Sequence, residues 1–197
     1  MRPASHFIRR LIAARQTLAT AESCTGGLIA HTLTNIPGAS VWFKGGVVAY
    51  ADTAKSALLK VAPALIRRHG AVSAPVAKAM AQGIRRSLDA TFAVATTGIA
   101  GPSGGTPEKP VGLVFIAAAS PRRTIVRKFL FKGTRSQIKR QTLAMAMALL
   151  KDACVNGKKM HRDTDTNQCS LRSRKPKEGR QVHVGLNSHD DRHKPGR

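Results

Sequence analysis

Short apolar runs alternate with amphipathic stretches along the first 150 residues, and this alternation predicts an α/β domain. Runs typical of strands occupy 18–22, 45–50, 92–97, 111–119 and 125–131. Apolar positions three or four residues apart predict helices over 4–15, 25–35, 53–60, 64–69, 73–88 and 134–151. The last two strands meet near Ser120-Pro121 as a hairpin. We therefore expect a mixed sheet covered by helices on both faces.

The character of the chain changes after Lys151. Residues 152–197 are polar, lack aromatic side chains and show no hydrophobic periodicity. A segment of this composition has too little apolar surface to offset the entropy lost on ordering. We therefore divide the chain into a folded domain, 1–151, and a basic polar tail, 152–197, that we expect to be disordered. The tail is either an interaction segment or a non-native extension.

Basic residues outnumber acidic ones throughout the predicted domain. The chain has 33 lysines and arginines against 10 aspartates and glutamates, a net charge of +23, and residues 1–150 contain 21 and four, a net charge of +17. This excess favours anionic partners such as nucleotides or nucleic acid, although a host adapted to acid conditions would produce it with no partner. With one Trp, one Tyr and six Phe, base stacking has little support, so nucleic acid is possible but not favoured.

Several classes of site find no support in the sequence. Cys24, Cys154 and Cys169 lack metal-ligand spacing, and their odd number argues against a disulfide framework, so a reducing cytoplasm fits best. No HExxH-like pair occurs, and we assign no metal and no cofactor. No apolar run reaches the roughly 18 residues needed to span a bilayer. The first fifteen residues, basic and amphipathic, are typical of a transit peptide or a docking helix, and we favour the helix.

A turn rich in hydroxyl groups and glycine, 21–27 with the sequence AESCTGG, lies where the first predicted strand passes into a helix. Unpaired backbone N–H groups at a helix start can hold an anion or a developing oxyanion, and glycine lets it approach closely. Ser23 is therefore a candidate nucleophile for an amide or carbonyl carbon, or else an ordinary helix cap. Cys24 is an alternative nucleophile, although a small buried thiol is commoner.

Polar residues also follow the other predicted strands. Because ligands of α/β sheets bind outside the carboxyl ends of strands, we expect these residues to converge on one cleft. Lys55 is a candidate proton acceptor for Ser23, or else a solvated lysine. Tyr50 is a candidate for polarising a substrate or passing a proton, or else a strand-end tyrosine with a hydrated hydroxyl. The loop 98–105 lacks the Walker and GxGxxG patterns, so it is a weak phosphate signal or a tight β-connection.

Taken in order, these motifs resemble the CinA C-terminal domain family, whose members include nicotinamide-nucleotide amidohydrolases. The matching stretches, within residues 7–150, are 18–27, 37–40, 45–50, 69–73, 97–102 and 109–112. The resemblance implies a three-layer α/β/α sandwich with a mixed sheet. It also implies an amidase that converts nicotinamide mononucleotide to nicotinate mononucleotide and ammonia in pyridine-nucleotide salvage. The alternative is a non-catalytic nucleotide- or DNA-associated protein linked to competence and DNA damage.

The resemblance also implies a set of site residues and partners. It maps the nucleophile onto Ser23 and the other catalytic positions onto Tyr50, Lys55 and Thr97. The expected substrate-binding residues are Cys24, Thr25, Gly26 and Gly27 of the turn, for the oxyanion, and Gly98, Gly101, Gly104 and Gly105 of the loop, for the nucleotide. We expect a small-molecule nucleotide substrate, a homo-oligomer, no membrane and a cytoplasmic location.

Two positions depart from the family pattern. Ser103 stands where many relatives have an acidic residue or glycine, and Ala51-Asp52 replaces a more usual Ser-Asn or Ser-Asp pair. Both bear on binding more than on the nucleophile. The family also occurs as the second half of longer proteins with a metal-dependent nucleotide pyrophosphatase in front, and we do not carry that activity over to this chain.

Overall fold

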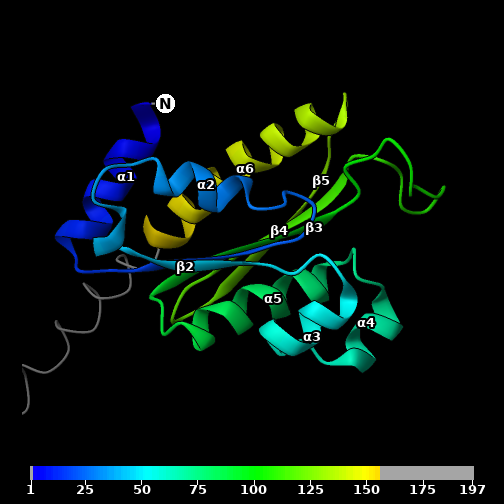
Figure 1. Cartoon of the computed structure of the whole chain (residues 1–197), viewed down its shortest axis with the longest axis horizontal. Helices are drawn as coiled ribbons and strands as arrows, with labels where there is room; N and C mark the ends of the chain where they lie inside the picture. The colour runs from blue at the N-terminus through cyan, green and yellow to red at the C-terminus, as the bar shows by residue number, and fades with distance from the viewer. Residues whose placement is uncertain (1, 156–197) are drawn as a thin grey trace, which may run out of the picture.

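A five-stranded mixed sheet lies at the centre of the computed structural model, which describes residues 2–155 (Figure 1). The strands run in the order β2-β1-β3-β4-β5 and comprise β1 (Leu18–Glu22), β2 (Phe43–Val48), β3 (Phe92–Gly98), β4 (Leu113–Ala119) and β5 (Thr124–Leu130). β1 is parallel to both β2 and β3, whereas β4 is antiparallel to β3 and β5. The carboxyl ends of β1, β2 and β3 therefore lie at the same edge of the sheet.

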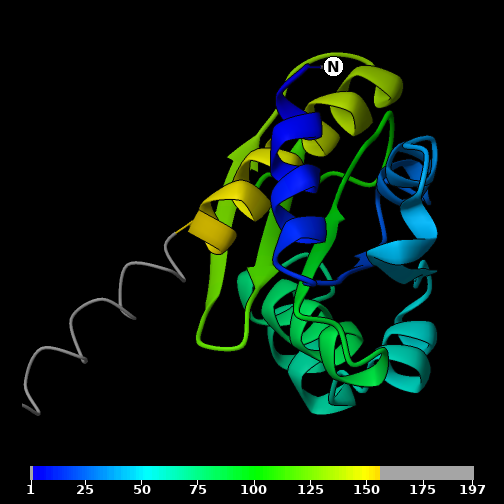
Figure 2. The same cartoon turned by 90° about the vertical axis from the view of Figure 1, so that its left-hand side faces the viewer.

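Helices cover both faces of this sheet (Figures 1 and 2). One face carries α1 (Arg2–Ala13), α2 (Leu28–Thr34) and α6 (Arg135–Val155), and a 3-10 turn, η1 (Ala39–Val41), leads into β2. The other face carries α3 (Asp52–Leu59), α4 (Pro63–His69) and α5 (Ala74–Ser87). The expected mixed α/β sheet in three layers is confirmed.

The alternation of side chains along the strands builds two hydrophobic cores. On β3, Phe92 and Val94 belong to the core under α1, α2 and α6, while Ala93 and Ala95 belong to the core under α3, α4 and α5. Fully burying a large apolar side chain such as Met80 of α5 contributes about 1.5–3 kcal/mol. Because the β-strand side chains facing α5 are mostly alanines, this helix can approach the sheet closely.

Several element ends differ from the sequence-based prediction, by up to four residues. α2 begins at Leu28 rather than at residue 25, and β2 ends at Val48, so Tyr50 follows the strand. α6 continues to Val155 because buried residues at helical spacing, Ala146, Leu149, Leu150 and Ala153, extend its apolar stripe beyond residue 151. Residues 156–197 of the expected disordered tail lie outside the described residues.

Candidate active site

Three strand ends meet at the carboxyl edge of the sheet, as the sequence predicts. Glu22, at the end of β1, is level with Val48 of β2 and Thr96 of β3. The Ser23 N–H donates to the Thr96 carbonyl at 3.0 Å, which continues the parallel ladder by one residue. Ser23 is therefore level with Thr97, in strands that lie about 4.8 Å apart.

Strand alternation assigns Ser23 and Thr97 to the same face of the sheet. Ala21 of β1 and Ala95 of β3 both belong to the core under α3, α4 and α5, and residues two positions further along share their face. Ser23 is 8% exposed and Thr97 1%. The Thr97 hydroxyl donates to the Ala71 carbonyl at 2.8 Å. The nucleophile candidate thus lies beside a buried threonine whose hydrogen already has an acceptor.

Glu22, and not Ser23, caps α2. The Glu22 carboxylate accepts hydrogen bonds from the N–H groups of Ile29 at 3.1 Å and Ala30 at 2.8 Å. The residue preceding the helix is Gly27, with φ 90°, and no side chain caps from that position. The interpretation of Ser23 as a helix cap is therefore wrong. The N–H groups of Ile29 and Ala30 do hold an anion, but it is the buried Glu22 carboxylate, so they are not available to a substrate.

The remainder of the turn is fastened to β3. The Thr25 and Thr96 hydroxyl oxygens lie 2.8 Å apart in a buried hydrogen bond. The Gly26 N–H donates to the Ser23 carbonyl at 3.1 Å, so it is not free for an oxyanion. The N–H groups of Cys24, Thr25 and Gly27 have no backbone acceptor within residues 2–155. The Cys24 N–H interacts with its own thiol, so Thr25 and Gly27 are the turn donors best suited to a substrate oxygen.

Cys24 is a small buried thiol, in agreement with the commoner of its two interpretations. Its side chain is 6% exposed. Burial raises the pKa of this thiol to about 12, and a hydrogen bond from its own backbone N–H opposes the rise only in part. A thiol that stays protonated is a poor nucleophile, so the Cys24 side chain does not compete with Ser23.

The raised pKa of Cys24 predicts an alkaline loss of stability. Above pH 9, the ordinary pKa of a thiol, Cys24 ionises in the unfolded chain but stays protonated in the folded one. Rising pH therefore favours the unfolded chain. Relative to Cys24→Ala, wild type should lose about 1.4 kcal/mol of unfolding free energy per pH unit. Denaturant titrations of both proteins at about pH 8 and about pH 10.5 measure this difference. Burial also raises the pKa of Cys154 to about 12. Because both proteins contain this thiol, its contribution cancels in the difference between their unfolding free energies. A stability difference independent of pH would contradict the prediction.

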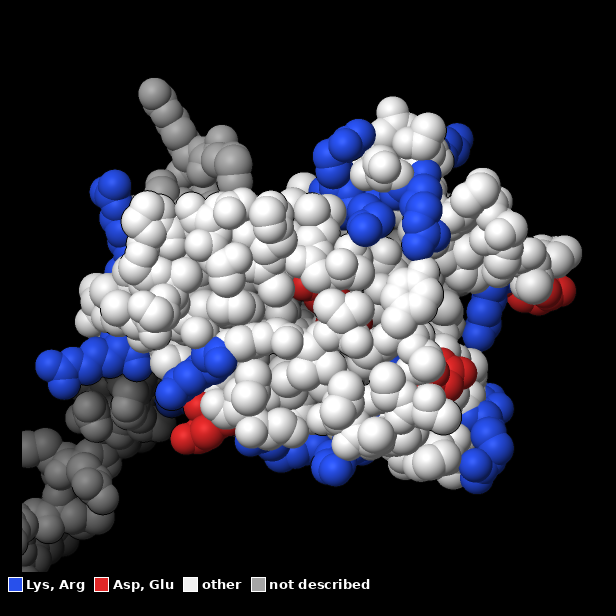
Figure 3. All heavy atoms as spheres, in the orientation of Figure 1, with Lys and Arg blue, Asp and Glu red and all other residues white. Residues whose placement is uncertain are grey.

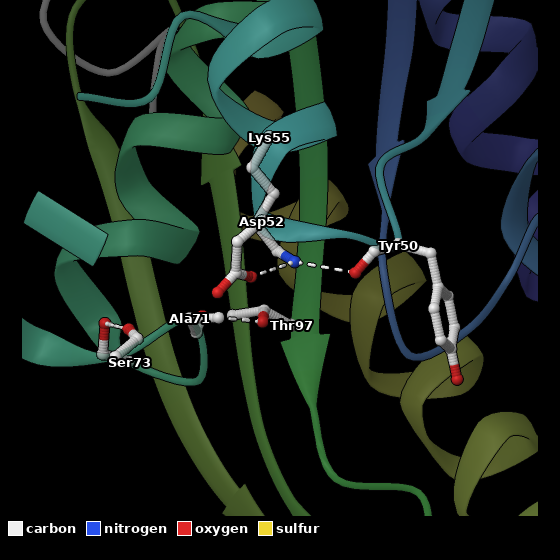
Figure 4. A network of polar contacts seen from close by, with 7 residues as sticks. Tyr50, Asp52, Lys55, Ala71, Ser73 and Thr97 are labelled. Carbon is white, nitrogen blue, oxygen red and sulfur yellow. Dashed lines mark hydrogen bonds and ion pairs between the residues drawn. The ribbon is translucent and has the colours of Figure 1, made fainter. Parts of the chain in front are cut away.

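Lys55 is buried at the start of α3 and is not the solvated lysine of the alternative interpretation. Its side chain is 2% exposed, and its amine donates to the Tyr50 carbonyl at 3.0 Å and to Asp52 Oδ1 at 3.1 Å (Figure 4). Asp52 is 56% exposed, so the ion pair reaches from the interior to the surface. Among the described residues no hydrogen bond joins Lys55 to Ser23. Figure 4 shows Lys55 and Thr97 on neighbouring elements at the same edge.

Arg135 is a site residue that sequence reasoning missed. Its guanidinium donates to the Tyr50 hydroxyl at 2.9 Å and to the Gly101 carbonyl at 2.7 Å, linking two predicted site regions. Tyr50 is 58% exposed, so its hydroxyl is accessible, as its alternative interpretation states. An arginine in the first turn of a helix is unfavourable, because its positive charge faces the positive end of the helix dipole. This unfavourable position is the one feature of the sequence that could have marked Arg135 as a functional residue.

Lys139 lies one turn further along α6. Its amine is 3.6 Å from the position that a Cβ on Gly26 would occupy, so it lies against the turn that follows Ser23. Its charge also acts on the Cys24 thiol. Figure 3 shows basic side chains gathered over the start of α6, beside a face with few charges. Together Arg135 and Lys139 place two cations next to the turn and Tyr50.

Close packing explains most of the loop glycines. A Cβ on Gly98 would meet the Leu113 carbonyl at 2.6 Å, and one on Gly105 would meet the Val111 backbone nitrogen at 2.7 Å. A Cβ on Gly101, where φ is 73°, would meet the Val111 side chain at 2.6 Å. Gly104 has φ 87° and more space. The loop is thus a tight β-connection, and its binding role stays a prediction.

Two kinds of feature are absent from the described part of the chain. No helix within residues 2–155 is long and apolar enough to cross a membrane. No group of three or more His, Cys, Asp and Glu side chains in that range is arranged to hold a metal ion.

Comparison with known proteins agrees with this architecture. A CinA-like protein of Mycobacterium tuberculosis is 52% identical over 146 residues, which cover 74% of this chain and 34% of that protein. A CinA-like protein of Anaeromyxobacter dehalogenans is 49% identical over 144 residues, 73% of this chain and 35% of that protein. The chain thus spans about a third of the length of these relatives.

Solved structures show the same fold. The competence/damage inducible protein CihA of Agrobacterium tumefaciens is 38% identical, with a TM-score of 0.72, over 78% of this chain and 95% of that one. The competence damage-inducible protein A of Klebsiella pneumoniae is 32% identical, with a TM-score of 0.74, over 77% of this chain and 94% of that one. The sequence model of the CinA C-terminal domain matches residues 2–154, and the chain belongs to the CinA C-terminal domain family.

Proposed function

We propose that this domain is an amidohydrolase that converts nicotinamide mononucleotide to nicotinate mononucleotide and ammonia. The observation that carries the proposal is the placement of Ser23 at the carboxyl end of a central strand, level with Thr97, with its role as a helix cap taken by Glu22. A serine at this position that does not cap the helix is available for chemistry. Family membership supports the same reaction.

The residues present can carry out a two-step acyl transfer. Ser23 Oγ bonds to the carboxamide carbon and its proton passes to Lys55, after which the C–N bond breaks and the nitrogen leaves as ammonia with that proton. Water then hydrolyses the ester and releases the carboxylate. To accept the Ser23 proton, Lys55 must first release one from the ammonium that pairs with Asp52. The neutral amine keeps two N–H groups, for which the Tyr50 carbonyl and Asp52 are acceptors, and a lone pair that can take the Ser23 proton.

Different groups are suited to the two negative charges, the oxyanion that develops in the reaction and the phosphate of the substrate. The N–H groups of Thr25 and Gly27, which lack backbone acceptors among the described residues, are suited to the developing oxyanion. Arg135 and Lys139 are suited to the phosphate of a mononucleotide, because Arg135 contacts the Tyr50 hydroxyl and the Lys139 amine lies against Gly26 of the turn. This assignment moves the phosphate from the glycine loop to the start of α6.

A substrate panel tests the proposed activity. Purified protein should release ammonia from nicotinamide mononucleotide faster than from the riboside, which lacks the phosphate, or from the dinucleotide, in which the phosphate is joined to a second nucleotide by a pyrophosphate bond. Ammonia is measured with a coupled assay, and calorimetry measures binding. Binding of the mononucleotide without ammonia release would contradict the amidase and favour the non-catalytic alternative.

The preference for the phosphate should depend on Arg135. Loss of a charged hydrogen-bonding group costs about 1.5–3 kcal/mol, so Arg135→Ala should reduce the ratio of kcat/KM for the mononucleotide over the riboside about 10- to 100-fold. Arg140→Ala, an exposed change on the same helix, is the matched control and should leave the ratio unchanged. An equal loss with both substrates in Arg135→Ala would assign the arginine to holding Tyr50 rather than to the phosphate.

A further inference from the structure

The segment after α4 has an unusual set of hydrogen bonds. Three successive carbonyls, at 69–71, each accept a hydrogen bond from a side chain outside the segment, at 2.8–2.9 Å: His69 from Lys109, Gly70 from Ser73 and Ala71 from Thr97. Figure 4 shows the Thr97 bond close to Asp52 and the Lys55 amine, with Ser73 further from them. Carbonyls that end a helix and enter a turn lack regular partners. Here the segment is held at once by Lys109, which follows the glycine loop, by Ser73, which precedes α5, and by Thr97 of β3.

Of the three donors, Lys109 lies furthest along the sequence from the carbonyl that it binds. It lies 40 residues from His69 along the chain, and its amine donates to the last carbonyl of α4, where a positive charge is favourable. A Cβ at Gly70 would lie 2.6 Å from the Lys109 amine, and Gly70 has φ 75°. Because glycine has no Cβ, position 70 leaves room for the Lys109 amine.

Lys109 also anchors the exposed part of the loop. Residues 102–108 are exposed, whereas Lys109 is half-buried. The Thr106 N–H donates to the Lys109 carbonyl at 2.9 Å, and the Lys109 N–H donates to the Thr106 hydroxyl at 3.1 Å. One residue therefore closes the tip of the loop and fastens it to α4.

The hydrogen bond to the 69–71 segment fixes the polarity of the Thr97 hydroxyl. A hydroxyl has one hydrogen, and that of Thr97 is donated to the Ala71 carbonyl. Only lone pairs remain, so Thr97 can accept a hydrogen bond but cannot donate another. Beside Ser23, the Thr97 oxygen can accept a hydrogen bond from the NH2 group of a carboxamide or from the departing ammonia. It would repel the oxygen of a carboxylate, which has no hydrogen to donate.

We propose that Lys109 is a positioning residue: it holds the loop 98–112 against the 69–71 segment, and thereby keeps Thr97 an acceptor that selects the carboxamide over the carboxylate product. The loop anchor stands on the geometry alone. The selection of the carboxamide rests on the proposed amidase function. The two parts are therefore tested by separate measurements.

Hydrogen exchange without substrate tests the anchor. Lys109→Met removes the donor, and the hydrogen-bonded amides of Ile99, Thr106, Lys109 and Gly112 should exchange about 10- to 100-fold faster, since a charged hydrogen bond is lost. Lys109→Arg keeps a cationic donor and should restore most of the protection. Lys128→Met, which removes an exposed lysine of β5, is the control for charge. Wild-type exchange of this loop in Lys109→Met would overturn the proposal, whatever the activity.

Kinetics with the carboxamide test the selection. Lys109→Met should lower kcat/KM about tenfold or more and make the carboxylate product a stronger inhibitor, because a released Thr97 hydroxyl can donate to it. Lys109→Arg should recover both values. Faster loop exchange with unchanged kinetics and product inhibition would overturn the link to Thr97. Absence of ammonia release from wild type would instead contradict the proposed function, and the exchange measurement would still decide the anchor.

Discussion

Replacement of Ser23 by alanine is expected to lower ammonia release from nicotinamide mononucleotide about a thousandfold or more while leaving the fold intact. The structure separates the two effects. The bond from Ser23 to Thr96 is made by the backbone N–H, which alanine keeps. Among the described residues no hydrogen bond involves the Ser23 hydroxyl, and α2 is capped by Glu22 instead. Loss of activity would therefore report on chemistry rather than on folding.

Three further measurements complete the Ser23 test. Ser23→Ala should unfold at the wild-type denaturant concentration and should still bind the mononucleotide in calorimetry. Ser103→Ala, a change of the same kind in the exposed loop, should retain activity. Full activity of Ser23→Ala would remove Ser23 as nucleophile. Cys24 would not be its replacement, because burial holds the pKa of that thiol near 12.

The order of strands and helices could be predicted from the sequence because it depends on local periodicity. The convergence of Ser23 and Thr97 also followed, since both stand at the carboxyl ends of strands that proved to be adjacent and parallel. The end of α6 did not follow. The apolar spacing through Ala153 is visible in the sequence, but polar neighbours such as Lys151 and Asp152 obscured it.

The remaining site contacts could not be predicted because they join distant side chains to backbone groups. Nothing local distinguishes Lys55 from a surface lysine, since its burial depends on how α3 packs against the sheet. Arg135 reaches Tyr50 across 85 residues of sequence, a contact that only the packed fold creates. For Glu22 a local signal did exist, because a carboxylate just before a helix suits its positive end. The neighbouring Ser23 is also a common type of helix cap, so the sequence alone does not decide between the two residues.

Glu22→Ala is expected to have the largest effect on stability, a loss of about 3 kcal/mol of unfolding free energy. The carboxylate is 1% exposed and accepts from two backbone N–H groups. Alanine leaves the buried Ile29 N–H and the half-buried Ala30 N–H without an acceptor. Glu22→Gln should cost less, because its carbonyl oxygen retains one acceptor while its NH2 group opposes the other N–H. Denaturant titration measures the order wild type, glutamine, alanine, and Glu108→Gln, at a fully exposed carboxylate, controls for charge.

The same substitutions should separate support of the turn from direct chemistry. Glu22 joins the strand that carries Ser23 to the helix behind it, so a looser α2 start should displace the Thr25 and Gly27 N–H groups from the substrate oxygen. We expect kcat to fall in the order of the stability losses, at a temperature where each variant stays folded, with KM changing less. A stability loss in Glu22→Ala with unchanged kcat would show that the oxyanion does not depend on this turn, and other donors, such as Lys55, would then have to supply its stabilisation.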